Sequence, residues 1–141
     1  MINKEVLQEI LGAENVFDDP VILKNYSSDN SFVRESVPQY VVKPQNAQQI
    51  QKIVLLAKEN NTPLIPVSSG EPHFKGDTVP VFGGIVLDLS NMKRIVQIQR
   101  EHRVAMVEPG VTFAMLQPEL KKNGLRLPLP LCPKNTKSMI Q

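Results

Sequence analysis

Small, turn-forming residues cluster between Ser68 and Gly84 in a pattern that suits phosphate binding. The stretch begins with Ser68, Ser69 and Gly70, two hydroxyl side chains followed by a residue without a Cβ. Glycine adopts positive φ and lets neighbouring backbone N–H groups converge, so such a loop can hold a phosphate or a diphosphate. A plain connection that uses glycine and proline as turn residues is the alternative, and composition by itself favours that alternative.

Two common nucleotide-binding motifs are missing from the chain. Neither G-x-G-x-x-G nor G-x-x-x-x-G-K-[ST] occurs, so the sequence indicates neither a Rossmann site nor a P-loop. The candidate loop nevertheless has about fifteen irregular residues, and a loop of that length inside a compact domain is typical of a binding site.

The other reactive side chains do not form a recognisable catalytic set. His73 lies within the loop and His102 falls in a short polar turn, where a solvated side chain is the simpler interpretation. Cys132 is the single cysteine, so no internal disulfide can form, and a reducing, cytoplasmic location is expected. We assign no catalytic base among these residues.

Composition limits the classes of protein to consider. The chain has 141 residues, 41% of them hydrophobic and 21% charged, with a formal net charge of +2, which is ordinary for a globular domain. Basic and acidic residues are interspersed, which argues against nucleic acid or an anionic membrane as the main partner. No apolar run approaches the ~18 residues of a membrane span, so no membrane insertion is expected.

The elements that must position the loop are two short apolar strands. Residues 64–67 precede it and residues 85–89 follow it, and both runs are partly β-branched. A strand at residues 40–43 and a helix capped by Asn46 come before, which predicts parallel strands joined by a helical crossover. The loop then leaves the carboxyl end of a parallel strand, where open α/β sheets bind ligands.

The remaining segments are mostly short and separated by turns. Asn3 and Thr112 are placed to cap helices, and Pro118 is expected to kink or shorten the second of these. Proline is frequent after Pro109, so the end of the chain should be extended. The pattern predicts helices at residues 3–11, 18–24 and 112–123, a hairpin of residues 94–99 and 103–108, and an extended segment at 125–133.

Several segments, in this order, resemble one known family. They include Pro66-Val-Ser-Ser-Gly70, Gly84-Ile-Val-Leu-Asp-Leu-Ser-Asn-Met92 and Val107-Glu-Pro-Gly-Val-Thr112, with Val41-Val-Lys-Pro44 before them and residues 116–124 after them. Together they are similar to the amino-terminal part of the FAD-binding domain of the vanillyl-alcohol oxidase and p-cresol methylhydroxylase (PCMH) superfamily. Within it, the chain looks closest to the glycolate oxidase and D-lactate dehydrogenase type of FAD-linked oxidase.

The resemblance implies an α+β fold, the first subdomain of a PCMH-type FAD-binding domain, with a small mixed sheet flanked by helices. It implies a helical lead-in at residues 1–36 and the FAD-binding subdomain at 37–141. Glu108 would lie near the flavin, and Leu131 would begin a segment that approaches its ring. The residues implied to contact FAD are Pro66, Val67, Ser68, Ser69, Gly70 and Glu71 at the diphosphate, Pro109 and Gly110 on the flavin side, and Cys132 and Pro133 in that approaching segment.

The loop departs from the family pattern at several positions. A basic residue is usual near the place of Val67 and Ser68, and Glu71-Pro72 replaces small residues. A carboxylate beside a diphosphate is repulsive unless it points away, and proline removes a donor. Some relatives attach flavin covalently to a histidine in this loop, but the spacing of His73 from Gly70 differs, so we expect non-covalent FAD.

Family members are much longer than this chain, which predicts a truncated fragment or a subunit of a split enzyme. Its partner would be the remainder of the flavoprotein or a complementary subunit, and a homo-oligomer is left open. The implied function is a flavin oxidoreductase acting on a small-molecule substrate, a 2-hydroxy acid or related alcohol. The alternative is a non-catalytic assembly or interaction subunit that has kept the fold.

Overall fold

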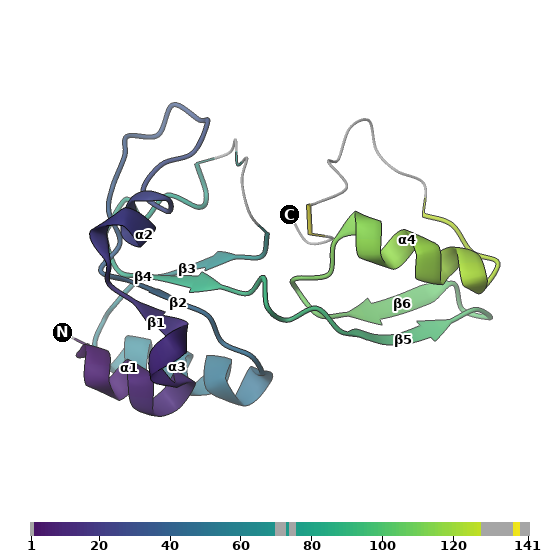
Figure 1. Cartoon of the computed structure of the whole chain (residues 1–141), viewed down its shortest axis with the longest axis horizontal. Coiled ribbons are helices and arrows are strands. Elements are labelled where there is room, and N and C mark those ends of the chain that lie inside the picture. The colour runs from purple at the N-terminus through teal and green to yellow at the C-terminus, as the bar shows by residue number, and fades with distance from the viewer. Residues whose placement is uncertain (1, 70–72, 74–75, 128–136, 139–141) are drawn as a thin grey trace. The chain divides into compact units, whose positions relative to one another are not determined.

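The computed structural model describes residues 2–69, 73, 76–127 and 137–138 of the chain. It forms two compact units (Figure 1). The first unit contains the described residues up to Val67 together with those from 73 to Leu89, and the second contains residues 68–69 and the described residues from Ser90 onward. Both units combine helices with strands, so the predicted α+β class is confirmed.

A four-stranded sheet forms the centre of the first unit (Figure 1). Its order is β1-β2-β4-β3, with β1 antiparallel to β2 and with β2 and β3 both parallel to β4. The parallel strands predicted around the crossover are therefore confirmed, although they are not neighbours, because β4 lies between them. The bounds are β1 Val16–Phe17, β2 Tyr40–Val42, β3 Leu64–Val67 and β4 Ile85–Asp88.

The central strand β4 owes its place to its side chains, all four of which are buried. Val86 is fully buried and pairs with Val41 of β2 on one side and Ile65 of β3 on the other. These residues pack with Leu23 in one apolar cluster. A run buried on both faces is typical of parallel strands covered by helices and loops.

The helices of the first unit begin close to the predicted residues. They are α1 (Lys4–Leu11), α2 (Pro20–Lys24) and α3 (Ala47–Glu59), with a 3-10 turn at Ala13–Asn15. The Asn46 side chain accepts the N–H of Gln49 at 2.9 Å, as the capping pattern predicts. Asn3 is the N-cap residue of α1, as predicted, but its side chain makes no capping hydrogen bond.

The second unit is a hairpin covered by one helix (Figure 1). Strands β5 (Ile95–Gln99) and β6 (Val104–Val107) pair antiparallel, as predicted, with an irregular register near Ile95. Helix α4 (Phe113–Lys122) lies against one face of the hairpin. The cluster that joins them comprises Val111, Leu116 and Leu120, packed against Ile95, Ile98, Ala105, Val107, Leu125 and Leu127.

Pro118 lies inside α4 without ending it. The sequence predicted that Pro118 would kink the helix or shorten it, and the shortening is wrong because the helix continues to Lys122. A proline removes one backbone donor from the helix, but Leu116 and Leu120 on either side are both buried. Burial of these two leucines outweighs the lost hydrogen bond. Among the described helices of both units, none has the length and apolar composition needed to cross a bilayer.

Candidate functional site

The loop after β3 starts from a fixed point in the sheet. Val67, the last residue of β3, is buried, and its carbonyl accepts the N–H of Leu89 at 2.7 Å. Ser68 and Ser69 follow directly and are only 7% and 4% exposed. The structure therefore places two small hydroxyl side chains, largely shielded from solvent, at the carboxyl end of a parallel strand.

The middle of the loop is held by the segment around Asp29. One carboxylate oxygen of Asp29 accepts the N–H of Gly76 at 2.7 Å, and the other accepts the N–H of Ser31 at 3.0 Å. The N–H of Asn30 donates to the carbonyl of His73 at 2.8 Å. Desolvation acts to raise the pKa of Asp29, but the hydrogen bonds from Ser31 and Gly76 lower it overall.

Gly76 fits its position because it has no side chain. Its φ is +76°, and a Cβ there would lie 2.3 Å from Cγ2 of Val33. Any larger residue would push the loop away from the segment that holds it. The loop is thus held near its middle, at His73 and Gly76, by the segment of residues 29–33.

A buried polar cluster lies at the end of β4, beside the end of β3. Asp88 pairs with Val67 in the sheet register and is 4% exposed. Its carboxylate accepts the hydroxyl of Tyr26 at 2.8 Å and lies 3.4 Å from Nζ of Lys43, whose Nζ also lies 5.5 Å from the ring centroid of Phe17. Burial and the adjacent carboxylate raise the pKa of Tyr26.

Sequence reasoning missed this cluster. An aspartate at the end of the otherwise apolar strand Ile85–Asp88 was the signal that could have indicated it, because a buried carboxylate needs partners. Its charge is compensated by Lys43 and by the Tyr26 hydroxyl, so it is poorly placed to act as a free base. We assign it the role of fixing the carboxyl edge of the sheet.

A second carboxylate fixes the corner that follows the hairpin. Glu108 is buried, and its two oxygens accept the backbone N–H and the Nε–H of Arg94, both at 2.7 Å. The hydrogen bond from the Arg94 backbone holds the pKa of Glu108 below its usual value, against desolvation that acts to raise it. Glu108 therefore ties the beginning of the hairpin to its end.

The backbone of this corner is already hydrogen-bonded. The N–H of Gly110 donates to the carbonyl of Met92 at 2.8 Å, and the carbonyl of Pro109 accepts the hydroxyl of the buried Ser138 at 2.5 Å. Proline has no N–H of its own. The Gly110 N–H is therefore not free to bind a phosphate. A cofactor at this corner would instead make van der Waals contacts with its surface.

The residues predicted to contact a cofactor fall into three groups. Pro66 and Val67 end β3 in the first unit, and four others, Ser68, Ser69, Pro109 and Gly110, belong to the second unit. Four more lie outside the described residues, so the structure gives no position for them, and the assigned contacts stay predictions. These four are Gly70, Glu71, Cys132 and Pro133.

The two histidines differ in their surroundings. His102 is exposed in the turn between β5 and β6, as its sequence context predicts. His73 is only 8% exposed, and its charge contributes to the lowered pKa of Asp29. Within the described parts of the chain, no group of His, Cys, Asp and Glu residues has the arrangement of a metal site.

The chemistry of these residues fits a diphosphate. Ser68 and Ser69 offer hydroxyl groups and little bulk at the carboxyl edge of the sheet. Small side chains of this kind suit a loop that binds an anion through its backbone N–H groups.

Comparisons with known proteins identify the family of this chain. A family model described as an FAD binding domain matches residues 38–137. The glycolate oxidase protein GlcD of Bacillus subtilis (strain 168) is 32% identical over 131 residues, which cover 91% of this chain and 28% of that protein. The flavoprotein subunit of 4-cresol dehydrogenase [hydroxylating] of Pseudomonas putida is 31% identical over 128 residues, covering 87% of this chain and 25% of that protein.

A solved structure shows the same fold. The crystal structure of p-cresol methylhydroxylase with substrate bound superimposes with a TM-score of 0.76 at 30% identity, covering 86% of this chain and 24% of that one. The chain thus spans about a quarter of the length of the relatives it matches. The resemblance found in the sequence is confirmed, and the chain belongs to the FAD-binding domain family of the vanillyl-alcohol oxidase and p-cresol methylhydroxylase superfamily.

Proposed function

We propose that this chain is the part of a flavin oxidoreductase that holds the diphosphate of FAD, in an enzyme that oxidises a small 2-hydroxy acid or a related alcohol. The observation that carries the proposal is the pair of buried serines, Ser68 and Ser69, at the carboxyl end of the parallel strand β3. When bound, FAD supplies the hydride-accepting chemistry. The residues of this chain bind and orient the cofactor.

Backbone N–H groups of the loop after β3 would hold the two phosphates, with the residues from Pro66 to Glu71 forming the wall. Hydrogen bonds from N–H groups to an anion are shorter and stronger than bonds between neutral groups. Pro109 and Gly110 would contact the flavin side through their surface, and Cys132 and Pro133 would approach the ring. The hydrogen bonds that hold His73 and Gly76 of this loop support the role, because a loop with fixed anchor points loses less entropy on binding.

The substrate class is proposed from the kinds of relatives. Two of them are named as part of a glycolate oxidase and as a mitochondrial D-lactate dehydrogenase [cytochrome] of Arabidopsis thaliana, and both names refer to 2-hydroxy acids. Because this chain covers about a quarter of such proteins, the substrate-binding residues would come from the remainder of the flavoprotein or from a complementary subunit. We place this protein in the cytoplasm, on the basis of its single cysteine.

We propose that the FAD is held without a covalent bond. His73 is the one histidine of the loop. It is buried, and its carbonyl is fixed by the N–H of Asn30. The spacing of His73 from Gly70 also differs from the family pattern. Denaturation in acid should therefore release all flavin into the supernatant.

The test is flavin retention together with competition. The chain is mixed with FAD, desalted, and examined by its absorption spectrum. We expect retained flavin, displacement of FAD by excess ADP, which carries a diphosphate, and no displacement by riboflavin, which carries no phosphate. Displacement by riboflavin but not by ADP would contradict a diphosphate site, and a colourless protein would favour the alternative of a non-catalytic assembly subunit.

A further inference from the structure

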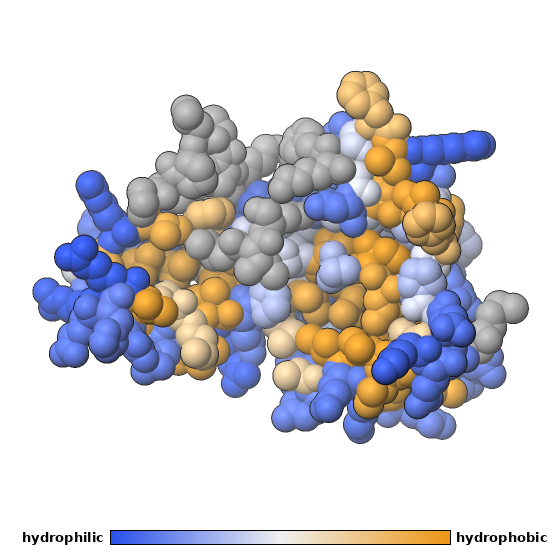
Figure 2. All heavy atoms as spheres, turned by 180° about the vertical axis from the view of Figure 1, so that it is seen from behind, coloured by the Kyte–Doolittle hydropathy of each residue, from blue (hydrophilic) through white to orange (hydrophobic). Residues whose placement is uncertain are grey.

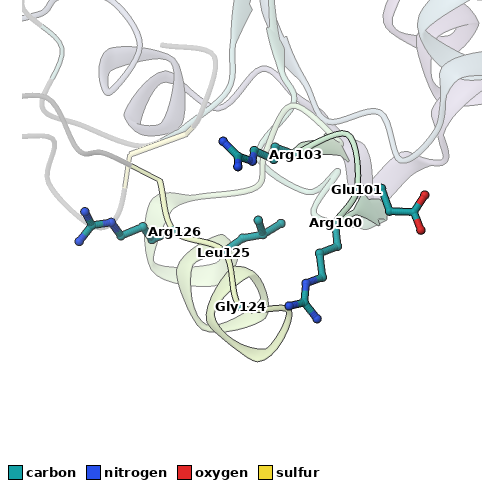
Figure 3. A pocket seen from close by; sticks show the side chains of 6 residues that line it. All are labelled: Arg100, Glu101, Arg103, Gly124, Leu125 and Arg126. Carbon is teal, nitrogen blue, oxygen red and sulfur yellow. The ribbon is translucent and has the colours of Figure 1, made fainter.

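Three arginines of the second unit line one open hollow (Figure 3). Arg100 and Arg103 belong to the turn between β5 and β6, and Arg126 follows α4. The hollow has a volume of about 710 Å³ and is also lined by Glu101, Gly124 and Leu125. It is formed within the second unit, by residues other than those assigned to the diphosphate.

The acid at this hollow does not neutralise the arginines. Figure 3 shows the Glu101 carboxylate pointing away from Leu125. Over residues 2–69, 73, 76–127 and 137–138, the ion pairs join other side chains, and none includes Arg100, Arg103 or Arg126. The hollow therefore has a surplus of positive charge that no described side chain compensates.

Arg100 has a structural role that partly explains its presence at the hollow. Nη2 of Arg100 lies 3.6 Å from the position that a Cβ would take at Gly124, just after the end of α4. The carboxyl end of a helix favours a nearby cation. Arg103 lies between two strands, so no helix end accounts for its charge.

Arg103 occupies a strained position in the turn. Its φ is +54°, in the left-handed region that glycine and asparagine adopt with least cost. Its N–H donates to the carbonyl of Arg100 at 3.2 Å, which closes the turn. Because glycine would relax this turn, the presence of arginine points to a role for its side chain.

The sequence around the hollow also carries a net positive charge. Residues 90–141 contain nine Lys and Arg residues against three Glu residues. Figure 2 shows hydrophilic side chains gathered at the end of this unit where the hairpin turns. A surplus of this kind raises the local concentration of acidic partners and speeds their association.

We propose that this hollow is a docking site for an acidic segment of a partner protein, in which carboxylates flank an apolar side chain. Figure 3 shows the three guanidinium groups pointing in different directions, so a single phosphate is poorly shaped to contact them all. Successive carboxylates along a peptide can each reach one of them. The half-buried Leu125 offers an apolar contact between the arginines. This inference does not depend on FAD binding.

The probe is the blocked peptide Glu-Glu-Leu-Glu-Glu, titrated into the 141-residue chain and followed by heteronuclear NMR. We expect shifts at the β5–β6 turn and after α4, and weaker binding as ionic strength rises from about 0.01 M to about 0.15 M, where the screening length falls from about 30 Å to about 8 Å. Arg103→Gln and Arg126→Gln should each weaken binding about fivefold. Lys93→Gln, an exposed charge of the same unit outside the hollow, should leave it unchanged.

Arg103→Gly separates binding from folding. Glycine relieves the strained φ, so the melting temperature should stay the same or rise while binding of the peptide weakens. If Gln-Gln-Leu-Gln-Gln bound as tightly as the acidic peptide, the proposal would be overturned. It would also be overturned if Lys93→Gln weakened binding as much as the arginine variants, because that would indicate a diffuse charge effect. Binding of inorganic pyrophosphate at the same residues as tightly as the acidic peptide would instead indicate a small-anion site.

Discussion

Replacing Gly84 by alanine tests the contact that joins β3 to β4 at the start of both strands. Gly84 has φ +96°, and a Cβ there would lie 2.3 Å from the carbonyl oxygen of Pro63 and 3.0 Å from its Cβ. The same carbonyl accepts the N–H of Ile85 at 2.9 Å. Alanine at this position must therefore move backbone atoms that make a hydrogen bond within the sheet.

The neighbouring Gly83 provides a matched control. Its φ is +69°, but a Cβ there would meet nothing within 4 Å. Gly83→Ala should therefore cost only the left-handed backbone conformation, about 1–2 kcal/mol. Gly84→Ala bears that cost and also weakens the hydrogen bond to Pro63, about 1 kcal/mol more, before any cost of the close contact itself. We expect a total of about 2–4 kcal/mol for Gly84→Ala.

Urea unfolding measures both variants. A small domain is stable by about 5–15 kcal/mol, and its free energy of unfolding falls by about 1–3 kcal/mol per molar urea. The midpoint of Gly84→Ala should therefore lie about 1 M or more below that of the wild type, with Gly83→Ala between the two. Equal midpoints for the two variants would refute the close approach of Gly84 to Pro63.

Three further substitutions test other contacts of the fold. Tyr26→Phe removes the hydroxyl that donates to the buried Asp88 and should lower the free energy of unfolding by about 1.5–3 kcal/mol, measured by urea titration; no loss would contradict the buried cluster. Leu116→Ala empties part of the core of the second unit and should cost about 2–5 kcal/mol, visible as faster hydrogen exchange in α4. Glu108→Gln should destabilise at pH 7. Because the pKa of Glu108 is lowered in the folded state by Arg94, its contribution is present above about pH 4.3 and is lost as the pH falls further, so melting temperatures of wild type and variant should converge in acid.

Much of the fold could be predicted from local patterns. The α3 helix follows from its cap at Asn46 and an apolar stripe, and the hairpin follows from alternation on both sides of a polar turn. Strand β1 could not be predicted, because Val16 and Phe17 form only two residues of strand and depend on pairing with β2. Such pairing is decided by tertiary contacts and leaves almost no local pattern.

The candidate site was harder to predict than the elements around it. Proline and glycine marked the loop, but Asp29, which holds its middle, lies 47 residues before Gly76 in the sequence. The polar cluster of Tyr26 and Asp88 spans 62 residues and leaves no local signal apart from a carboxylate in an apolar strand. Long-range polar contacts of this kind appear only once the chain has folded.

FAD binding by a variant with a carboxylate at the start of the loop tests the central claim most directly. Ser68→Glu places a negative charge where the diphosphate would lie, and Gln51→Glu adds the same charge on the exposed face of α3. Flavin fluorescence titration, with melting temperatures to check folding, gives both affinities. We predict that Ser68→Glu loses FAD binding and that Gln51→Glu keeps the wild-type affinity. Wild-type affinity in a folded Ser68→Glu protein would contradict the assignment of this loop to the diphosphate.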